Sequence, residues 1–164
     1  MEKRYLDSGY VVIPVRADKS PSLPRWKGVK LEDCANMRFG TDAIGLLTGE
    51  INGIVVLDID VSHDGLGYFK KEIMGSMPND GPVSVTGGGG LHYFFAYNHE
   101  TAVGNRYRLR KKGLDFKSDG GYVIVPPSIH SNGNKYRWKR SLFTHELPEL
   151  PPLILKILKE PRNR

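Results

Sequence analysis

The chain has 164 residues, of which 39% are hydrophobic and 26% charged, a composition that excludes a disordered chain. This length suffices for one hydrophobic core, so we expect a single domain over residues 1–164. No apolar run reaches the ~18 residues of a membrane helix, and residues 1–7 lack the apolar stretch of a signal peptide. Cys34 is the only cysteine, which excludes an intramolecular disulfide and a zinc site built on several thiolates. We therefore expect a reduced, cytoplasmic protein without a membrane partner.

The net charge of +6 is distributed unevenly along the chain. Residues 1–100 hold 10 Lys and Arg against 13 Asp and Glu, whereas residues 101–164 hold 14 against 5. Ten of the basic side chains fall within residues 105–140, together with two acidic ones. Such a stretch is typical of a protein that binds a polyanion. A solvated face that maintains solubility has the same pattern, so charge alone leaves both interpretations open.

Short apolar runs punctuated by glycine and proline predict many short strands joined by tight turns. We expect strands over residues 10–15, 43–47, 53–60, 82–86, 91–97, 105–110, 113–117, 122–125 and 136–139. Helices are expected over residues 31–37, 62–77 and 153–159. Residues 87–90 and 118–121 are turn sequences, and the second predicts a hairpin between its flanking strands. Strands outnumber helices, which predicts an α+β fold with a mostly antiparallel sheet.

Asp58 and Asp60 end the clearest strand of the sequence. Residues two apart on a strand point to the same face, so two carboxylates meet at one place. They repel each other unless a cation lies between them, and oxygen ligands of this kind suit Mg²⁺ or Mn²⁺. Alternatively, one Asp caps the following helix while the other faces solvent.

Asp115 lies in a second apolar strand and offers a third carboxylate. Three carboxylates from two strands would complete a two-metal site of the kind that catalyses phosphoryl transfer. Lys117 shares the face of Asp115, where a cation would meet the charge of a triphosphate. A surface ion pair between the two residues is the alternative, and it would contribute little to stability.

A run of four glycines, residues 87–90, precedes His92. Glycines let the backbone approach a ligand and present N–H groups to an anion, and the histidine is placed to hydrogen-bond a phosphate. The run is neither a Walker A loop nor a dinucleotide fingerprint, because no Gly-Lys-Ser/Thr and no helix follow it. A flexible hairpin with a structural histidine remains the alternative.

Two prolines follow the apolar run 122–125 and place Ser128 in a rigid loop, from which it would donate to a phosphate or a ribose. No nucleophile elbow surrounds Ser128, so a nucleophilic role is not expected. A plain turn at this position is the alternative.

Cations alternate with aromatic residues upstream of Asp115 and again over residues 135–140. Such a mixture suits a single strand or a primer–template, because cations track the backbone while rings stack on bases. A half-buried strand with core aromatics gives the same pattern. The first group of candidate nucleic-acid contacts is Arg106, Arg108, Arg110, Lys111 and Lys112.

The ordered set of these motifs resembles the primase–polymerase (prim-pol) domain, a branch of the archaeo-eukaryotic primase superfamily found in plasmid, phage and CRISPR-associated replication proteins. The resemblance covers nearly the whole chain. It rests on Asp58-Ile59-Asp60, residues 86–95, residues 113–117 and residues 121–128, and it includes Lys19-Ser20-Pro21…Pro24-Arg25-Trp26 and residues 45–49.

The resemblance implies an RRM-like, mostly antiparallel catalytic sheet (about residues 51–150) packed with a small N-terminal α/β module (about residues 1–50), followed by a C-terminal helix and tail (151–164). It implies that Asp58, Asp60 and Asp115 bind two divalent cations, Mg²⁺ or Mn²⁺, and that His92 contacts the phosphates of the incoming nucleotide. Further nucleotide contacts implied at matching positions are Gly89, Gly90, Lys117 and Ser128.

The chain departs from the family pattern in two respects. The family often has a small hydroxyl residue two positions before the histidine, where this chain has Gly90. Some relatives carry a cysteine-rich zinc-binding insert, which a chain with one cysteine lacks, so no zinc is predicted.

The resemblance therefore implies template-dependent nucleotidyl transfer to a 3′-hydroxyl by a two-metal mechanism, in a prokaryotic cell that hosts a plasmid or a phage. The expected partners are single-stranded DNA or a primer–template, dNTP or NTP, and a helicase or accessory domain. A non-catalytic RRM-like binding module, or a catalytic fragment that needs further domains, is the alternative. A nicking initiator is disfavoured because no His-x-His is present.

Overall fold

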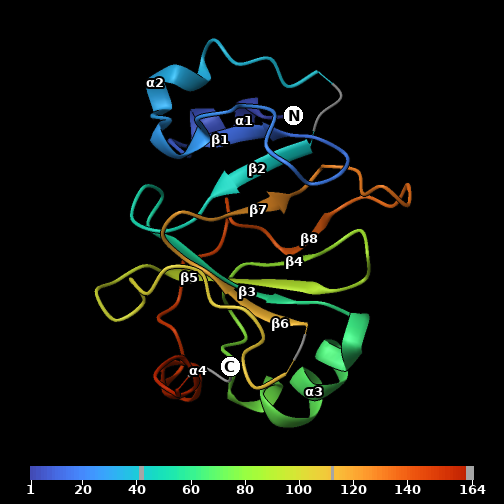
Figure 1. Cartoon of the computed structure of the whole chain (residues 1–164), viewed down its shortest axis with the longest axis vertical. Helices are drawn as coiled ribbons and strands as arrows, with labels where there is room; N and C mark the ends of the chain where they lie inside the picture. The colour runs from blue at the N-terminus through green and yellow to red at the C-terminus, as the bar shows by residue number, and fades with distance from the viewer. Residues whose placement is uncertain (41–42, 112, 162–164) are drawn as a thin grey trace.

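The computed structural model describes residues 1–40, 43–111 and 113–161 of the chain (Figure 1). Its strands are β1 (Val12–Val15), β2 (Ala43–Leu47), β3 (Ile54–Ile59), β4 (Val83–Val85), β5 (Leu91–Ala96), β6 (Leu114–Lys117), β7 (Tyr122–Val125) and β8 (Arg137–Arg140). The α-helices are α1 (Lys3–Asp7), α2 (Leu31–Cys34), α3 (Gly65–Glu72) and α4 (Pro152–Leu158). Single 3₁₀ turns are η1 (Trp26–Gly28), η2 (Ser62–Asp64) and η3 (Met74–Ser76). No helix in these three ranges is long and apolar enough to cross a bilayer.

The strands form two sheets in which every pairing is antiparallel, so the expected α+β fold is confirmed. The upper sheet in Figure 1 has the order β1-β2-β7, and the lower sheet has the order β6-β3-β5-β4-β8. Within the lower sheet, the run β3-α3-β4-β5-β6 with the order β6-β3-β5-β4 has the β-α-β-β connection of an RRM-like fold. Between β5 and β6, the residues that the structure describes (97–111 and 113) form no helix.

One face of the lower sheet is covered by α3 and α4, which lie below it in Figure 1. Phe69 and Ile73 from the α3 region and Ile154 and Ile157 from α4 pack against inward-facing residues of β3, β5 and β6. Helix α4 thus covers this face as a second helix between β5 and β6 would. The apolar positions of α3 and α4 recur at helical spacing, which fixes the face that each helix buries.

The other face of the lower sheet packs against the upper sheet. Ile54 and Val56 of β3 and Phe94 of β5 meet Ile44 and Val123 of the upper sheet in a second core. Because alternate residues of a strand face opposite sides, β3 contributes to both cores and is buried along most of its length.

The upper sheet is not built from the N-terminal residues alone, because its strand β7 comes from residues beyond 120. The predicted hairpin across residues 118–121 is therefore wrong: β6 lies in the lower sheet and β7 in the upper one. Thr48, just after β2, explains the crossing. Its hydroxyl donates to the Ser118 carbonyl (2.6 Å) and its N–H to the Gly121 carbonyl (3.0 Å), so the turn is attached to β2.

The expected strand over residues 105–110 is also wrong. Only Arg106 makes a β-bridge, to Phe116. Arg108 and Arg110 have φ values of 58° and 55°, in the left-handed region, and a continuous strand cannot contain them. The expected helix over residues 62–77 is split into η2, α3 and η3, with left-handed residues at His63 and Asp64.

Candidate functional site

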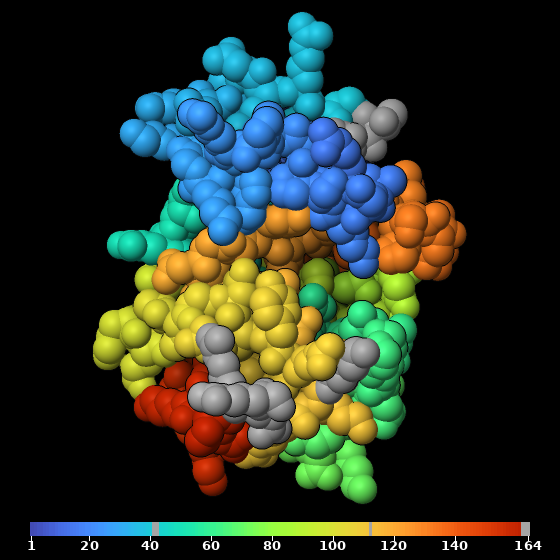
Figure 2. All heavy atoms as spheres, in the orientation of Figure 1, coloured from blue at the N-terminus to red at the C-terminus, as the bar shows by residue number. Residues whose placement is uncertain are grey.

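A cavity of about 660 Å³ lies between the two sheets, a volume typical of a small-molecule site. Figure 2 shows the surface hollowed below the blue N-terminal residues, above the yellow and green segments of the lower sheet. The cavity begins where the core between the sheets ends. Its floor is the upper face of β3 and β5, and its roof includes residues of the upper sheet and of the loop after β1.

The register of the lower sheet places four polar residues in one row, of which Asp58 and His92 line this floor. Asp58 of β3 is paired with Asp115 of β6 on one side and with His92 of β5 on the other. His92 is in turn paired with Ser84 of β4. Directly paired residues of antiparallel strands project on the same face with Cβ atoms about 5 Å apart. Four strands therefore bring together side chains that are far apart in the sequence. The largest separation, between Asp58 and Asp115, is 57 positions.

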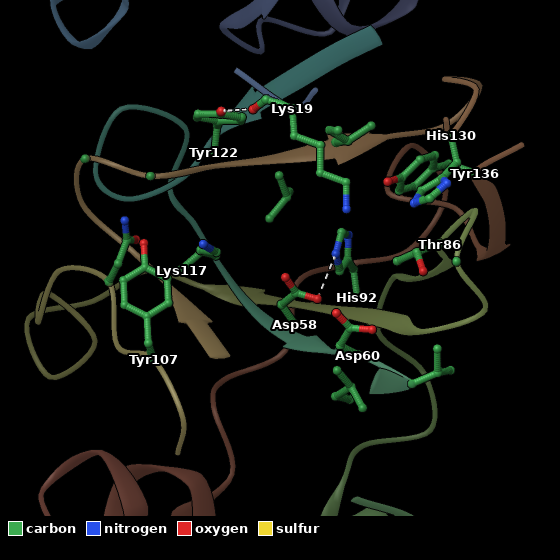
Figure 3. Close-up of a pocket in the computed structure, with 18 of the residues that line it drawn as sticks. Lys19, Asp58, Asp60, Thr86, His92, Tyr107, Lys117, Tyr122, His130 and Tyr136 are labelled. Atoms are coloured by element: carbon green, nitrogen blue, oxygen red, sulfur yellow. Dashed lines mark hydrogen bonds and ion pairs between the residues drawn. The ribbon is translucent and has the colours of Figure 1, made fainter. Parts of the chain in front are cut away.

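The central contact of the row joins Asp58 to His92 (Figure 3). His92 Nε2 lies 3.2 Å from Asp58 Oδ1, and the histidine is 5% exposed. Burial by itself would raise the pKa of Asp58, but the contact with His92 and the charges of Lys117 and Lys19 outweigh it and lower this pKa below its ordinary value. Asp58 is thus held ionised at the bottom of a cavity lined by cations.

Asp60 follows β3 and also lines the cavity. Its Oδ1 accepts a hydrogen bond from the Ser62 N–H at 3.0 Å, so it supports the turn that enters η2 and α3. The side chain is nevertheless exposed and is directed into the cavity beside Asp58 (Figure 3). The structure therefore joins the two interpretations of this pair, since Asp60 organises the turn and presents its carboxylate to the cavity.

Asp115 is half-buried beside Asp58, but it is not among the residues that line the cavity. Its Oδ1 accepts a hydrogen bond from the Arg108 N–H at 2.8 Å. Burial, together with the negative charges of Asp58 and Asp60, raises the pKa of Asp115, and the Arg108 hydrogen bond only partly offsets this. A carboxyl group in this position gains from a cation that would neutralise its neighbours.

The donor set of the floor fits a hard divalent cation in part. Asp58 and Asp60 offer carboxylate oxygens in the cavity, and Asp115 adjoins them through the sheet register. Over residues 1–40, 43–111 and 113–161, however, no three His, Cys, Asp or Glu side chains are grouped so as to hold a metal ion. Of the three predicted ligands, the structure thus brings two into the cavity and leaves the third beside it.

The glycine run forms the turn between β4 and β5, so the hairpin predicted there is confirmed. Gly88 and Thr86 line the cavity. Of the two predicted nucleotide contacts, Gly89 is not among the lining residues, and the Gly90 N–H donates to Thr86 Oγ1 at 2.9 Å. A Cβ at Gly90 would overlap the Ile59 carbonyl oxygen, which explains why this position, two before His92, has no side chain.

Lys117 lies where the sequence predicted, on the cavity wall one strand away from Asp58. Its Nζ is 4.6 Å from the centroid of the Tyr107 ring, a cation–π contact. Tyr107 is itself 61% exposed at the rim of the cavity. A cation and an exposed ring thus stand together at one end of the site.

Ser128 does not lie in the cavity lining. It is 1% exposed, and its Oγ accepts a hydrogen bond from the Ile44 N–H at 2.9 Å. This contact attaches the loop after β7 to β2, so the position gives Ser128 a role in the fold.

The described basic residues before β6, Arg106, Arg108, Arg110 and Lys111, lie outside the cavity lining as well. Arg110 forms an ion pair with Glu160, and Lys111 Nζ lies 4.0 Å from Asp64 Oδ2. Arg108 is exposed. Arg106 makes the bridge to Phe116, and Lys112 lies outside the described residues. Part of the positive charge of this segment is therefore neutralised within the chain.

Several cavity residues were not among the site residues predicted from the sequence. From the upper half come Lys19, Trp26 and Tyr122, and from the loop before β8 come His130 and Tyr136 (Figure 3). Lys19 and Trp26 were noted only within the family resemblance. The resemblance is the one signal that could have identified them, because their approach to Asp58 depends on how the two sheets stack.

Comparison with known families gives one match and comparison with curated proteins gives none. The sequence model of the family described as "Bifunctional DNA primase/polymerase, N-terminal" (Prim-Pol) matches residues 2–153. No curated protein matches the chain. The family match spans all eight strands and the beginning of α4.

Proposed function

Because the chain belongs to the Prim-Pol family of bifunctional DNA primase/polymerase N-terminal domains, we propose that its cavity catalyses template-dependent nucleotidyl transfer. In this reaction the 3′-hydroxyl of a primer, or of a first nucleotide, attacks the α-phosphate of an incoming dNTP or NTP. Pyrophosphate leaves with the electron pair of the broken P–O bond. The observation that carries the proposal is the pair Asp58 and His92 at the floor of a nucleotide-sized cavity, with Asp115 paired to Asp58 beside it.

Asp58 and Asp60, with Asp115 beside them, are the residues that would hold Mg²⁺ or Mn²⁺. Two such ions, when bound, lower the pKa of the attacking hydroxyl and neutralise the triphosphate and the leaving pyrophosphate. The repulsion that raises the pKa of Asp115 supports this assignment, because bound cations would relieve it. Asp115 adjoins the other two, since it is paired directly with Asp58.

The remaining cavity residues bind and orient. His92 Nε2 faces the Asp58 carboxylate. It would donate to a phosphate oxygen once Asp58 coordinates a cation. Lys117 adds a positive charge on the same face, and the backbone at Gly88 leaves room for a phosphate to approach. No side-chain nucleophile is needed, because positioning and charge stabilisation account for most of such catalysis.

The nucleic-acid partner is proposed to lie along the rim near Tyr107, where an exposed ring and basic residues occur together. A ring at the rim would stack on a base, and neighbouring Arg108 would contact the backbone. Neutralised Arg110 would contribute less. A helicase or an accessory domain remains a proposed further partner.

The test is extension of a labelled primer on a longer template, with dNTPs, in Mg²⁺ and in Mn²⁺. Asp58→Ala should reduce extension by at least ~10³-fold, because it removes a carboxylate from the reacting centre. Asp80→Ala is the matched control, since Asp80 is an exposed aspartate outside the cavity lining, and it should extend normally. Full activity of Asp58→Ala would contradict the proposal. A wild type that binds the primer–template without extending it would favour a binding module.

A further inference from the structure

One cation enters the cavity from above, on the loop that follows β1. Lys19 lies in the turn that follows β1, closed by a bridge between Val15 and Pro21. Two backbone hydrogen bonds close the turn. The Arg16 N–H donates to the Ser20 carbonyl and the Lys19 N–H donates to the Arg16 carbonyl, each at 2.8 Å. The Lys19 side chain leaves this turn toward the floor of the cavity (Figure 3).

The backbone of Lys19 is strained. Its φ is 68°, in the left-handed region that β-carbon-bearing residues rarely adopt. Strain of this kind persists only where the surroundings enforce it, and it is concentrated at functional sites. Here the hydrogen bonds that close the turn hold it, and the hydroxyl of Tyr122 on β7 adds a contact by donating to the Lys19 carbonyl oxygen. The Tyr122 ring is braced in turn by Trp26, at 5.0 Å between centroids and 85° between planes.

Lys19 also differs from the other lysines of the cavity in what its ammonium group contacts. Lys27 Nζ lies 5.6 Å from the Trp26 ring centroid, and Lys117 Nζ lies over the Tyr107 ring. Among the described residues, no carboxylate lies within ion-pair distance of Lys19 Nζ.

We propose that Lys19 binds the phosphates of the incoming nucleotide from the roof of the cavity, so that the triphosphate is held between the upper sheet and the carboxylate floor. This inference rests on the proposed function and adds a second side to its site. An ammonium group has three donors and no acceptor, so it suits oxygens of a polyphosphate. The turn and its Tyr122 contact hold Lys19 over the floor before the nucleotide arrives, which reduces the entropy lost on binding.

The test measures nucleotide binding directly, by calorimetric titration of the protein with dATP and with dAMP in Mg²⁺. Lys19→Gln should weaken dATP binding about 10- to 100-fold, the range expected for a lost charge-assisted hydrogen bond. Binding of dAMP should change little, because the β- and γ-phosphates are missing. Lys71→Gln is the matched control, an exposed lysine on α3 far from the cavity lining, and it should bind dATP as the wild type does.

A second variant separates binding from folding. Lys19→Gly removes the ammonium group and relieves the left-handed strain, so it should melt at a higher temperature than the wild type while binding dATP as weakly as Lys19→Gln. Tyr122→Phe should keep the charge but release the Lys19 carbonyl, giving a smaller loss of dATP affinity. A residue with only a structural role would not combine higher stability with lower affinity.

The outcomes distinguish this inference from the proposed function. If the wild type binds dATP and Lys19→Gln binds it equally well, Lys19 is not a phosphate contact and the proposed function stands. If the wild type extends primers but binds no dATP by itself, the inference about Lys19 is overturned and the proposed function stands. If Lys19→Gln loses affinity for dATP and dAMP equally, Lys19 contacts another part of the nucleotide and the roof position of the β- and γ-phosphates is wrong.

Discussion

The two faces of the lower sheet carry the same strands but very different chemistry. On the helix face, β3 presents Val55, Leu57 and Ile59, all fully buried under α3 and α4. On the opposite face, the same strand presents Ile54 and Val56 to the upper sheet and then Asp58 to the cavity. One face is thus apolar along its whole length, while the other changes from apolar to ionised within a single strand.

The difference shows how this fold positions a charged site without sacrificing its core. The helix face supplies stability over the full width of the sheet. The opposite face is covered only as far as β2 and β7 reach, so the position of the upper sheet decides where the cavity begins. Asp58 lies one alternation beyond Val56, at the first uncovered position of β3.

The largest expected effect comes from breaking the helix face. Phe69 is fully buried in α3 and contacts the Tyr93 ring at 5.2 Å between centroids. Phe69→Ala should lower the free energy of unfolding by about 3–5 kcal/mol, because it leaves a cavity in a dry core. Nucleotide transfer per folded molecule should be retained at low temperature. Denaturant unfolding and primer extension measure the two effects.

Asp58→Asn is the complementary variant on the opposite face. It should abolish transfer while costing only a small part of the stability that Phe69→Ala removes, since the side chain is 29% exposed and keeps its shape. A stability loss as large as that of Phe69→Ala would show that the two faces are not separate in function.

The glycine turn gives a second, smaller comparison within one hairpin. A Cβ at Gly90 would meet the Ile59 carbonyl, whereas one at Gly88 would meet nothing closer than His130 Nε2 at 3.7 Å. Gly90→Ala should therefore lower the free energy of unfolding by about 1–3 kcal/mol, as overpacking does. Gly88→Ala should lower it by only a small fraction of this amount. Thermal unfolding of the two variants checks this. Equal stabilities would mean that the β4–β5 turn can shift away from β3.

The floor of the site could be predicted from the sequence because it depends on local rules. Strand alternation places Asp58 on one face of β3, and the apolar run around Asp115 identifies a second strand. The row that includes His92 then follows from which strands pair. The family resemblance supplied the order of these motifs, and the family match over residues 2–153 confirmed the resemblance.

The roof could not be predicted by the same rules. Residues 118–121 have the composition of a hairpin turn, but Thr48 binds their carbonyls and directs β7 into the other sheet. That single crossing brings Tyr122 over Asp58, and with it Lys19. At Ser128 the error is the opposite one. Its rigid loop suggested a ligand contact, but its hydroxyl accepts a hydrogen bond from the Ile44 N–H. Both outcomes depend on long-range packing.

Two buried serines differ in whether their hydroxyl has a hydrogen-bond partner. Ser128 Oγ accepts the Ile44 N–H, while Ser84 Oγ, fully buried beside His92, has no hydrogen-bond partner among the described residues. Ser128→Ala should cost about 1–3 kcal/mol because it leaves a buried N–H unsatisfied. Ser84→Ala should be neutral or slightly stabilising. Chemical denaturation of both variants measures the difference, and an equal cost would contradict this assignment.

The smallest expected effect is a gain in stability on the cavity face. Burial and the charges of Asp58 and Asp60 raise the pKa of Asp115, so the folded protein binds this proton more tightly than the unfolded chain does. Stability is therefore lost as the pH rises through the raised pKa and the carboxylate forms beside Asp58. Asp115→Asn removes this loss and keeps an oxygen to accept the Arg108 N–H, so at neutral pH it should stabilise the metal-free protein by up to about 1 kcal/mol.

The pH dependence of this gain is its sharpest check. The advantage of Asp115→Asn should be present above the raised pKa and should disappear as the pH falls below the ordinary carboxyl range, where Asp115 is protonated in both states. Thermal unfolding in EDTA across pH 3 to 8 measures it. Added Mn²⁺ should then stabilise the wild type more than the variant, because binding to the folded state adds stability by mass action. An Mn²⁺ shift of equal size in both proteins would remove Asp115 from the proposed ligand set while leaving Asp58 and Asp60 in it.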